Sequence, residues 1–436
     1  MTYINTQQSP VDPAVSRRPN TLSRLVYGSI FGVVVFLSIV GTTWSVSGVP
    51  VRSLVAVISL GMVFLLVPRT VLRTIRRNGP TLFLLGGFAA LGAVVSLANE
   101  ESLATVASEV IQIHFQAAIL FLLAYAISAR IGVRSAALIF ILCVTISTAV
   151  AAAQSLGMGW AWEVRLTVAR LVGEDLLSDY YFRYARPMGL AYSPVRLGLQ
   201  ICLALAAYLI VAPRPFLAFQ KFDNRVFIAF AIFAASSIAG QNRSPLLGGL
   251  IMLLVYLCAL RPKYIGILVA AIVVALPLGL TYLDTFEGSR VATVADESSL
   301  GRITFLVYGL ILFVNRPIGY GLGFNPIDYW PYYWEDIQWT PVPYFIQVFP
   351  LHNYFLTILN MYGFFVLFFV PIIIRIAKKY NIAVISLIPY WVHILFHNDG
   401  PMWSDFVVWF VFAFAVYAKD EEKNISEMAN PALRRG

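Results

Sequence analysis

The sequence predicts an all-α protein that crosses a membrane many times, and three observations support that fold class. Of the 436 residues, 59% are apolar and only 12% are charged, whereas soluble proteins carry about 45–50% and about 25% respectively. Apolar runs recur along most of the chain, and basic residues concentrate on alternate connecting segments. A water-soluble enzyme is therefore excluded.

We expect about twelve transmembrane helices, because about 20 apolar residues cross a bilayer. The expected spans are 25–45, 51–68, 81–98, 107–127, 136–157, 191–212, 226–240, 245–260, 264–282, 352–374, 381–397 and 405–418. Several are shorter than 20 residues, which indicates helices that end at a cavity rather than at the far headgroups.

The basic residues predict the orientation of these spans. Lys and Arg outnumber Asp and Glu by 31 to 22, a net charge of +9. Most of the basic residues fall on segments that share one side, which indicates that this side is cytoplasmic. Residues 1–24 and the polar tail 419–436, which we expect to be disordered, then both lie in the cytoplasm. The positive charge thus reports orientation and does not indicate a nucleic-acid partner.

Two long segments are expected on the outer side, at 158–190 and 283–351. The second of them separates a first membrane part, 25–282, from a second, 352–418. The second outer segment contains an apolar stretch, 302–314, that is too short to span a bilayer. We expect it to form a short interfacial helix between spans 9 and 10, and we expect function on the outer face.

Arginines at the outer boundary are unexpected, because the positive-inside rule favours the other side. They are Arg243 in a turn between two spans, Arg302 at the start of the short helix, and Arg186 and Arg196 beside the sixth span. Several arginines together suit an anionic ligand with two acceptor oxygens, such as a diphosphate. The alternative is that each reaches to anionic headgroups or pairs with a loop acid.

Histidines at the same boundary offer proton chemistry. His352 stands where the long outer segment re-enters the membrane, so it can exchange protons near an apolar boundary. His393 and His397 are four residues apart, with Asp399 just beyond, which is a spacing that metal ligands use. We interpret this pair as structural and expect no metal.

Aromatic and acidic residues alternate within the outer segment between 328 and 345. Flat rings beside hydrogen-bonding groups match the two kinds of surface that a sugar ring presents. The candidate sugar-binding residues are Trp330, Trp334, Trp339, Glu335 and Asp336. An aromatic belt at the headgroups is the alternative.

Four stretches in this order resemble the O-antigen ligase and O-antigen polymerase superfamily of bacterial envelope proteins. They are Arg186-Pro187-Met188-Gly189-Leu190 running into Ser193-Pro194; Asn242-Arg243-Ser244; Gly301-Arg302 followed by Asn315-Arg316-Pro317-Ile318-Gly319-Tyr320-Gly321-Leu322-Gly323; and His352-Asn353. The resemblance covers roughly residues 180–420. Asn242 departs from it, since relatives often have serine there.

The resemblance implies a metal-independent glycosyltransferase without a cofactor, in the bacterial inner (cytoplasmic) membrane. Such a protein transfers a glycan from an undecaprenyl diphosphate carrier to a sugar hydroxyl on the periplasmic face. Carried over to this chain, the family's arginines correspond to Arg243 and Arg302, and its histidine to His352. Arg243 and Arg302 would stabilise the leaving diphosphate, with Arg186 or Arg196 as a helper, while His352 would orient or deprotonate the attacking hydroxyl.

Two readings of the acceptor stay open. A polymerase extends the exopolysaccharide or O-antigen with further repeat units, and its partners include a chain-length regulator and a flippase. A ligase transfers the same glycan to lipid A-core. We favour the polymerase, because the aromatic segment suits an extended glycan. A secondary transporter is a third reading, but the chain shows neither two similar halves nor charged residues in mid-span.

Overall fold

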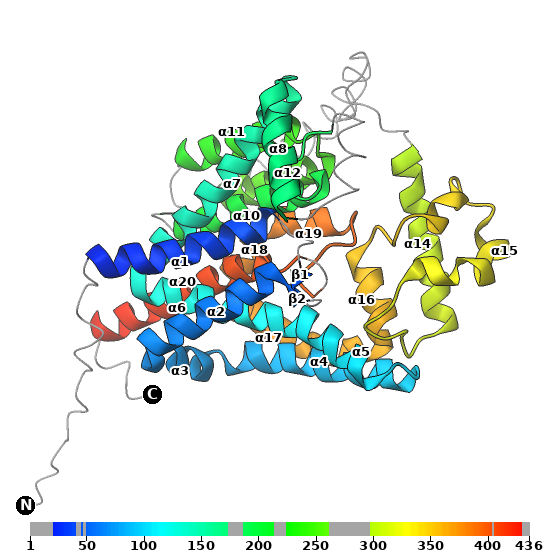
Figure 1. The fold of residues 1–436 in the computed structure, drawn as a ribbon, viewed down its shortest axis with the longest axis horizontal. Coiled ribbons are helices and arrows are strands. Elements are labelled where there is room, and N and C mark those ends of the chain that lie inside the picture. The colour runs from blue at the N-terminus through cyan, green and yellow to red at the C-terminus, as the bar shows by residue number, and fades with distance from the viewer. Residues whose placement is uncertain are drawn as a thin grey trace, which may run out of the picture.

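The computed structural model describes residues 21–40, 45–46, 49–172, 186–212, 224–260, 297–402 and 405–429. Within these ranges the fold is almost entirely helical, as Figure 1 shows. Six of the described helices are long and apolar enough to cross a membrane, or seven if one bent pair counts as a single span. The predicted all-α, multi-pass membrane protein is confirmed at this level, and the number twelve stays a prediction.

The first half of the chain supplies most of the long helices. They are α1 (Thr21–Val40), α2 (Val51–Leu66), α3 (Pro68–Arg77), α4 (Gly79–Ala98), α5 (Leu103–Val110), η1 (Ile111–Phe115), α6 (Gln116–Ile131), α7 (Val133–Ser155), α8 (Gly159–Val172), α10 (Pro194–Val211), α11 (Asn224–Ala239) and α12 (Arg243–Leu260). Two short strands, β1 (Ser45–Val46) and β2 (Val49–Pro50), pair as an antiparallel ribbon between α1 and α2. This ribbon is a small exception to the all-α prediction.

The second half of the chain forms shorter and more frequently interrupted helices. It contains α14 (Glu297–Asn315), η4 (Pro326–Tyr333), α15 (Trp334–Ile337), η5 (Pro343–Gln347), α16 (Tyr354–Tyr362), η6 (Gly363–Phe369), α17 (Val370–Lys379), α18 (Asn381–Ser386), α19 (Ile388–Ile394) and α20 (Val408–Ala429). Figure 1 shows α14, η4, α15 and η5 as a lobe at one end of the bundle, which we call the outer lobe.

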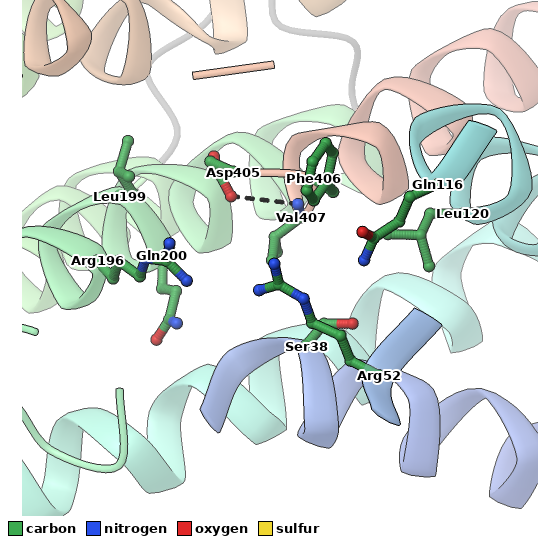
Figure 2. Close-up of a pocket in the computed structure, with 10 residues that line it drawn as sticks. All are labelled: Ser38, Arg52, Gln116, Leu120, Arg196, Leu199, Gln200, Asp405, Phe406 and Val407. Atoms are coloured by element: carbon green, nitrogen blue, oxygen red, sulfur yellow. Dashed lines mark hydrogen bonds between the residues drawn. The ribbon is translucent and has the colours of Figure 1, made fainter. Parts of the chain in front are cut away.

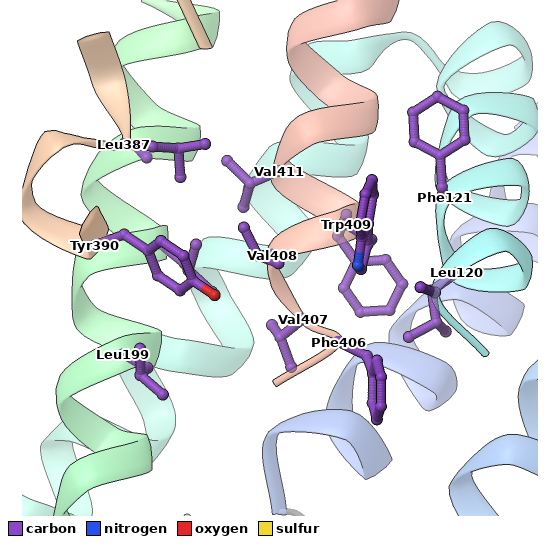
Figure 3. Close-up of a cluster of buried hydrophobic side chains, with 14 of the residues drawn as sticks. Leu120, Phe121, Leu199, Leu387, Tyr390, Phe406, Val407, Val408, Trp409 and Val411 are labelled. Atoms are coloured by element: carbon purple, nitrogen blue, oxygen red, sulfur yellow. The ribbon is translucent and has the colours of Figure 1, made fainter. Parts of the chain in front are cut away.

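The core lies where α20 packs between the helices of the first half. Leu120 and Phe121 of α6 face Trp409 of α20, and Tyr390 of α19 approaches from the other side, as Figure 3 shows. Deeper along α20, Phe410 meets the ring of Phe31 from α1 edge-on at 5.4 Å. Burial of large apolar side chains on every face of α20 indicates a central helix.

Several predicted spans are interrupted. The helices α2 and α3 meet at a bend of 112° just before Pro68, and the predicted span 381–397 is split into α18 and α19 ahead of Pro389. A proline lacks the backbone N–H that a continuous helix needs, so a break before it is expected. The predicted span 352–374 is divided at Gly363, whose φ is +65°.

Two predictions differ from the structure, and one predicted segment proves to contain a helix. The short outer helix predicted at 302–314 extends over Glu297–Asn315, because polar residues add a turn at its start. The tail predicted to be disordered from Lys419 continues α20 as far as Ala429. The outer segment 158–190 contains the helix α8. The predicted span 264–282 and residues 1–20 lie outside the described residues.

The glycine-rich segment after α14 has a structural role. Tyr320 and Gly321 donate backbone hydrogen bonds to the carbonyls of Asn360 and Met361 at 2.8 and 3.0 Å. Gly319 and Gly321 have φ of +93° and +95°, which residues with a Cβ rarely adopt. The segment therefore ties the end of α14 to α16 and sets how the outer lobe sits on the bundle.

Candidate functional site

The turn before α12 brings one predicted arginine to the centre of the molecule. Asn242 is buried, and its amide nitrogen donates to the carbonyls of Pro194 and Gly240, both at 2.9 Å. Arg243 and Ser244 then begin α12. A Cβ added at Gly248, one turn further on, would lie 2.6 Å from Cα of Pro389, so α12 and α19 cross with their backbones in contact.

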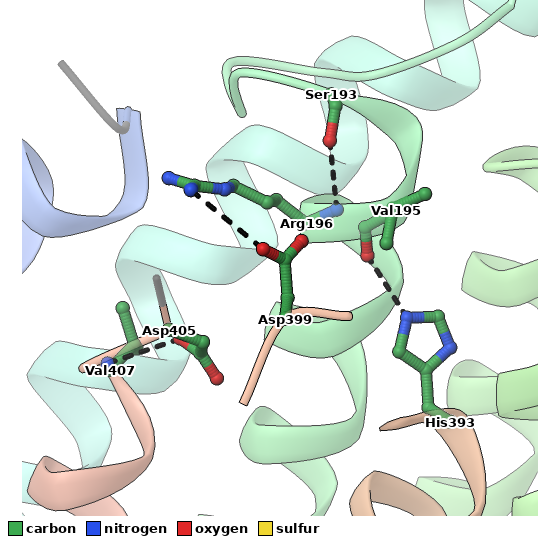
Figure 4. A network of polar contacts seen from close by, with 7 residues as sticks. All are labelled: Ser193, Val195, Arg196, His393, Asp399, Asp405 and Val407. Carbon is green, nitrogen blue, oxygen red and sulfur yellow. Dashed lines mark hydrogen bonds and ion pairs between the residues drawn. The ribbon is translucent and has the colours of Figure 1, made fainter. Parts of the chain in front are cut away.

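This close crossing places Ser244 against two histidines of the α19 region. The Ser244 hydroxyl lies 2.8 Å from Nδ1 of His393 and 3.3 Å from Nε2 of His397. On its other side His393 contacts the carbonyl of Val195 through Nε2, at 3.2 Å, as Figure 4 shows. The metal-like spacing of the two histidines is thus used to hold the Arg243 turn.

The start of α14 brings the second predicted arginine to the same place. The guanidinium of Arg302 lies over the ring of Phe396, 5.2 Å from its centroid, next to His397 in the chain. One turn later Phe305 stacks on the imidazole of His352, with centroids 4.7 Å apart and planes 9° apart. One helix therefore positions both an arginine and the histidine expected to act as a base.

The surroundings of His352 fix its protonation. Its Nδ1 lies 2.9 Å from the carbonyl of Pro350. A carbonyl only accepts, so Nδ1 carries the hydrogen and Nε2 keeps its lone pair in the neutral ring. Burial lowers the pKa of His352 below its ordinary value of 6.5, and the charge of Arg302 acts in the same direction, against the Pro350 hydrogen bond and Asp399. His352 is thus neutral and able to accept a proton at pH 7.

Asn353 and Tyr354 hold this histidine in place. The Asn353 side chain caps α16 by accepting from the backbone N–H of Leu356 at 3.1 Å. The hydroxyl of Tyr354 accepts from the backbone N–H of Met402 at 2.9 Å. The His352-Asn353 motif therefore combines a site residue with the cap that orients it.

The segment before α10 contributes Arg186, and α7 anchors that segment. The Gln154 side-chain oxygen accepts the backbone N–H groups of Met188 and Gly189 at 3.0 and 2.9 Å. Gly189 has φ of +60°, and a Cβ there would lie 2.1 Å from the carbonyl oxygen of Ser147. The charge of Arg186 acts on the imidazole of His397, as does that of Arg302.

These contacts define one group of residues, which we call the cationic cluster. It comprises Arg186, Arg302, His352, His393, His397 and Ser244, with Arg243 joined to Ser244 along the chain. The rings of His352 and His397 are 6.1 Å apart. Residues predicted from four separate stretches, at 186, 243, 302 and 352, are therefore brought to one place.

Arg196 belongs to a different group. Its guanidinium is 4.0 Å from the carboxylate of Asp399 and lies over the ring of Tyr192 at 5.4 Å. Arg52, over Phe406 at 5.7 Å, and Asp405 complete this group, which we call the Arg–Asp network. Figure 2 shows Arg52, Arg196 and Asp405 around one small polar pocket, and Figure 4 shows Asp399 reaching toward Arg196.

The predicted sugar-binding residues lie in the outer lobe. Trp330 and Trp334 are partly buried and meet edge-on at 5.9 Å, so both contribute to packing. Trp339 is 69% exposed, and Glu335 and Asp336 are exposed beside it. Figure 1 shows α15 at the far end of the lobe, away from α19. The structure does not bring these residues to the cationic cluster.

Some residues of the two groups were not predicted as site residues. Arg52 and Asp405 were not named, although Arg52 carried the same signal as the other arginines, a cation on the expected outer side. Ser244 was named only as part of the Asn242-Arg243-Ser244 motif, without a role of its own. Among the described residues, no group of three or more His, Cys, Asp or Glu is arranged to hold a metal ion.

Comparison with known proteins agrees with this geometry. Residues 225–370 match the family model described as O-antigen ligase. The match contains Arg243, Arg302 and His352, and it supports the O-antigen ligase and polymerase superfamily that the sequence motifs resemble. A search of curated proteins gives no match.

Proposed function

We propose, on the premise that residues 225–370 form an O-antigen ligase domain, that the protein transfers a glycan from an undecaprenyl diphosphate carrier to a sugar hydroxyl. The reaction takes place on the periplasmic face of the bacterial inner membrane. The observation that carries the proposal is the pairing of Arg302 with His352 through Phe305. This pairing places a cation beside a neutral base. The transfer needs both groups, the cation for the leaving diphosphate and the base for the attacking hydroxyl.

The cations act on the leaving group. When the bond between the anomeric carbon and the diphosphate breaks, its electron pair moves to the diphosphate oxygen. Guanidinium groups that are already in place stabilise that charge without reorganisation. Arg302 and Arg243 take this role, and Arg186 is favoured over Arg196 as the helper because its charge acts on His397, whereas Arg196 lies beside Asp399.

The base acts on the acceptor. The sugar hydroxyl gives its proton to Nε2 of His352 as its oxygen forms the new bond to the anomeric carbon. One in-line displacement inverts the anomeric centre. No metal enters this scheme, since the two charges that develop are met by guanidinium groups and by imidazole.

A groove on the bundle fits the carrier's long chain. It has a volume of about 540 Å³ and is lined, among the described residues, mainly by apolar side chains of α7, α10 and α11. The lining runs from Arg225 to Ala239, the whole length of α11, and Ala239 stands four residues before Arg243. An isoprenoid chain in this groove would place its diphosphate at the arginine turn.

The acceptor separates polymerase from ligase, and we propose the polymerase. The support is the outer lobe, where Trp339, Glu335 and Asp336 are exposed beyond the cluster and can contact the more distant sugars of a growing chain. A ligase that transfers to lipid A-core would use the same cationic cluster.

Reconstitution tests the proposal. The purified protein in liposomes receives the lipid-diphosphate-linked glycan extracted from cells that make the protein, with and without lipid A-core. We expect a ladder of longer glycans without lipid A-core, and no ladder from Arg302→Ala. Arg134→Ala, which changes an exposed arginine of α7, is the matched control.

Three outcomes would change the assignment. A product on lipid A-core alone would make the protein a ligase. Movement of the lipid-linked glycan across the membrane without a new covalent product would favour a transporter. Normal transfer by Arg302→Ala would refute the proposed site.

A further inference from the structure

His397 lies at the centre of the cationic cluster, yet the mechanism above gives it no task. It is only 8% exposed, and its Nδ1 has no hydrogen-bond partner among the residues that the structure describes. Buried nitrogen atoms are almost always hydrogen-bonded. An Nδ1 that no described residue meets, beside His352 and Arg302, is therefore placed to receive a hydrogen bond from a bound ligand.

The hydrogen-bond chain behind His397 determines what that partner is. His393 is fully buried and its Nε2 contacts the Val195 carbonyl, so Nε2 carries the hydrogen. A charged imidazole at this depth, beside the cations of the cluster, would be costly, so His393 is neutral and its Nδ1 is an acceptor. The Ser244 hydroxyl then donates to His393.

The same chain continues to His397. Because the Ser244 hydrogen is used on His393, its oxygen accepts from His397, and Nε2 of His397 must carry a hydrogen. In the neutral ring this leaves Nδ1 of His397 as a lone-pair acceptor. The tautomer is inferred here from the hydrogen-bond network. The positive charges of Arg302 and Arg186 that act on the ring also favour its neutral form.

An acceptor at Nδ1 needs a donor, and a sugar hydroxyl supplies one. We propose that His397 is a glycan-binding residue whose Nδ1 accepts a hydrogen bond from a hydroxyl beside the attacking one, and that Ser244 and His393 are positioning residues that fix its tautomer. The rings of His352 and His397, 6.1 Å apart, can then contact two neighbouring hydroxyls of one sugar. This inference rests on the proposed glycan transfer.

Two substitutions of His397 separate the roles of its nitrogens. The amide of asparagine reaches about as far as Nδ1, so His397→Asn keeps an acceptor there and loses the bond to Ser244. The amide of glutamine reaches about as far as Nε2, so His397→Gln keeps the bond to Ser244 and loses the acceptor. A glycan-binding role predicts that Asn works better than Gln, whereas a purely structural role predicts the reverse.

The measurement is KM and kcat for the lipid-linked glycan in liposomes, with the amount of folded protein determined for each variant. Loss of one hydrogen bond to a neutral group should raise KM about tenfold in His397→Gln and leave kcat within about threefold. His397→Asn should stay within about threefold of the wild type in KM. His114→Gln is the control, since His114 is also buried with an Nδ1 that no described residue meets, but its Nε2 contacts Tyr362 rather than a residue of the cationic cluster.

Ser244→Ala gives a second test that leaves His397 intact. Without the hydroxyl either tautomer of His397 is allowed, so KM should rise about threefold. Ser237→Ala removes another buried serine, one that bonds only to its own helix in the described structure, and should leave KM unchanged.

The results distinguish this inference from the proposed function. If Asn performs no better than Gln, or if Ser244→Ala has the KM of the wild type, the inference is wrong even though Arg302→Ala still abolishes transfer. If the wild type forms no glycan product at all, the proposed function itself fails.

Discussion

The cationic cluster and the Arg–Asp network both use outer-side arginines, and they differ in the charges that surround them. In the network, the guanidinium groups of Arg52 and Arg196 face two carboxylates, Asp399 and Asp405. In the cluster, the positive charges that act on His397 come from Arg302 and Arg186, while Asp399 acts on His352. The network pairs its guanidinium groups with carboxylates, whereas several guanidinium groups gathered beside neutral imidazoles suit an anionic ligand.

This difference distinguishes arginines that stabilise the fold from arginines that are suited to bind a ligand. A pair such as Arg196 and Asp399 joins the start of α10 to the segment after α19, and its charges cancel. Several guanidinium groups gathered at one place can together bind the oxygen atoms of an anionic ligand. Arginines that look alike in the sequence therefore differ in function, and substitutions can test the distinction.

The largest effect is expected in the cationic cluster. Removing a preorganised charge at the leaving group should lower kcat about 10²–10³-fold in Arg302→Ala and Arg243→Ala. Lysine at either position should restore little, because it lacks the two-pronged geometry of guanidinium. Transfer assays on membranes with equal protein amounts measure this, and full activity of either alanine variant would contradict it.

The Arg–Asp network should respond in stability instead. Arg196→Ala leaves Asp399 without its partner, at a cost between the roughly 1 kcal/mol of exposed pairs and the roughly 3 kcal/mol of buried ones. Thermal unfolding in detergent should show it, with kcat of the folded protein little changed. Lys419→Ala, which breaks the exposed pair with Glu422, is the control and should leave unfolding unchanged. A large fall in kcat at normal stability would move Arg196 into the cluster.

The pH dependence tests the base. The pKa of His352 lies below its ordinary value of 6.5, because burial and Arg302 disfavour the imidazolium. A neutral imidazole is the active form, so kcat/KM, which reports the free protein, should stay level near pH 7 and fall, by up to about tenfold per pH unit, only below that lowered pKa. Residual transfer by His352→Ala should lack this acid limb. A decline that begins above pH 6.5 would contradict the assignment.

The outer lobe should give smaller effects. Trp339 is exposed, so Trp339→Ala should raise KM by up to about tenfold, at the low end of stacking energies of about 1–3 kcal/mol. Trp330→Ala and Trp334→Ala remove packed rings and should reduce the amount of folded protein. An unchanged KM in Trp339→Ala would exclude it from sugar binding.

Chelation should have no effect. Because guanidinium and imidazole groups carry the proposed chemistry, EDTA should leave transfer by purified membranes unaltered. Loss of transfer that a divalent ion restores would require a metal-dependent mechanism.

The positions of the long apolar helices could be predicted well from the sequence. Which side chains contact each other in the folded protein could not. Apolar runs predicted helices at α4, α7 and α10 to within a few residues, because a membrane imposes both length and hydropathy. The positive-inside rule identified Arg243, Arg302 and Arg186, which share one cluster, together with Arg196, which does not. Nothing in the sequence separates them, since the separation depends on which side chains each guanidinium meets in the folded protein.

Packing explains the other discrepancies. Trp334 and Trp339 have the same character in sequence, yet one ring is covered by Trp330 and the other is open. The role of Ser244 depends on α12 and α19 crossing at Gly248 and Pro389, which no local pattern reports.

The stack of Phe305 on His352 couples the positions of His352 and Arg302. Phe305 and Arg302 are one turn apart on α14, so the helix links the arginine proposed to bind the leaving group to the histidine proposed as the base through a single aromatic contact. Under the proposed function, a shift of α14 that moved Arg302 away from the diphosphate would also displace His352. Water is a competing nucleophile for an activated sugar, and such a coupled shift would remove the base whenever the arginine is out of place, which would limit wasteful hydrolysis.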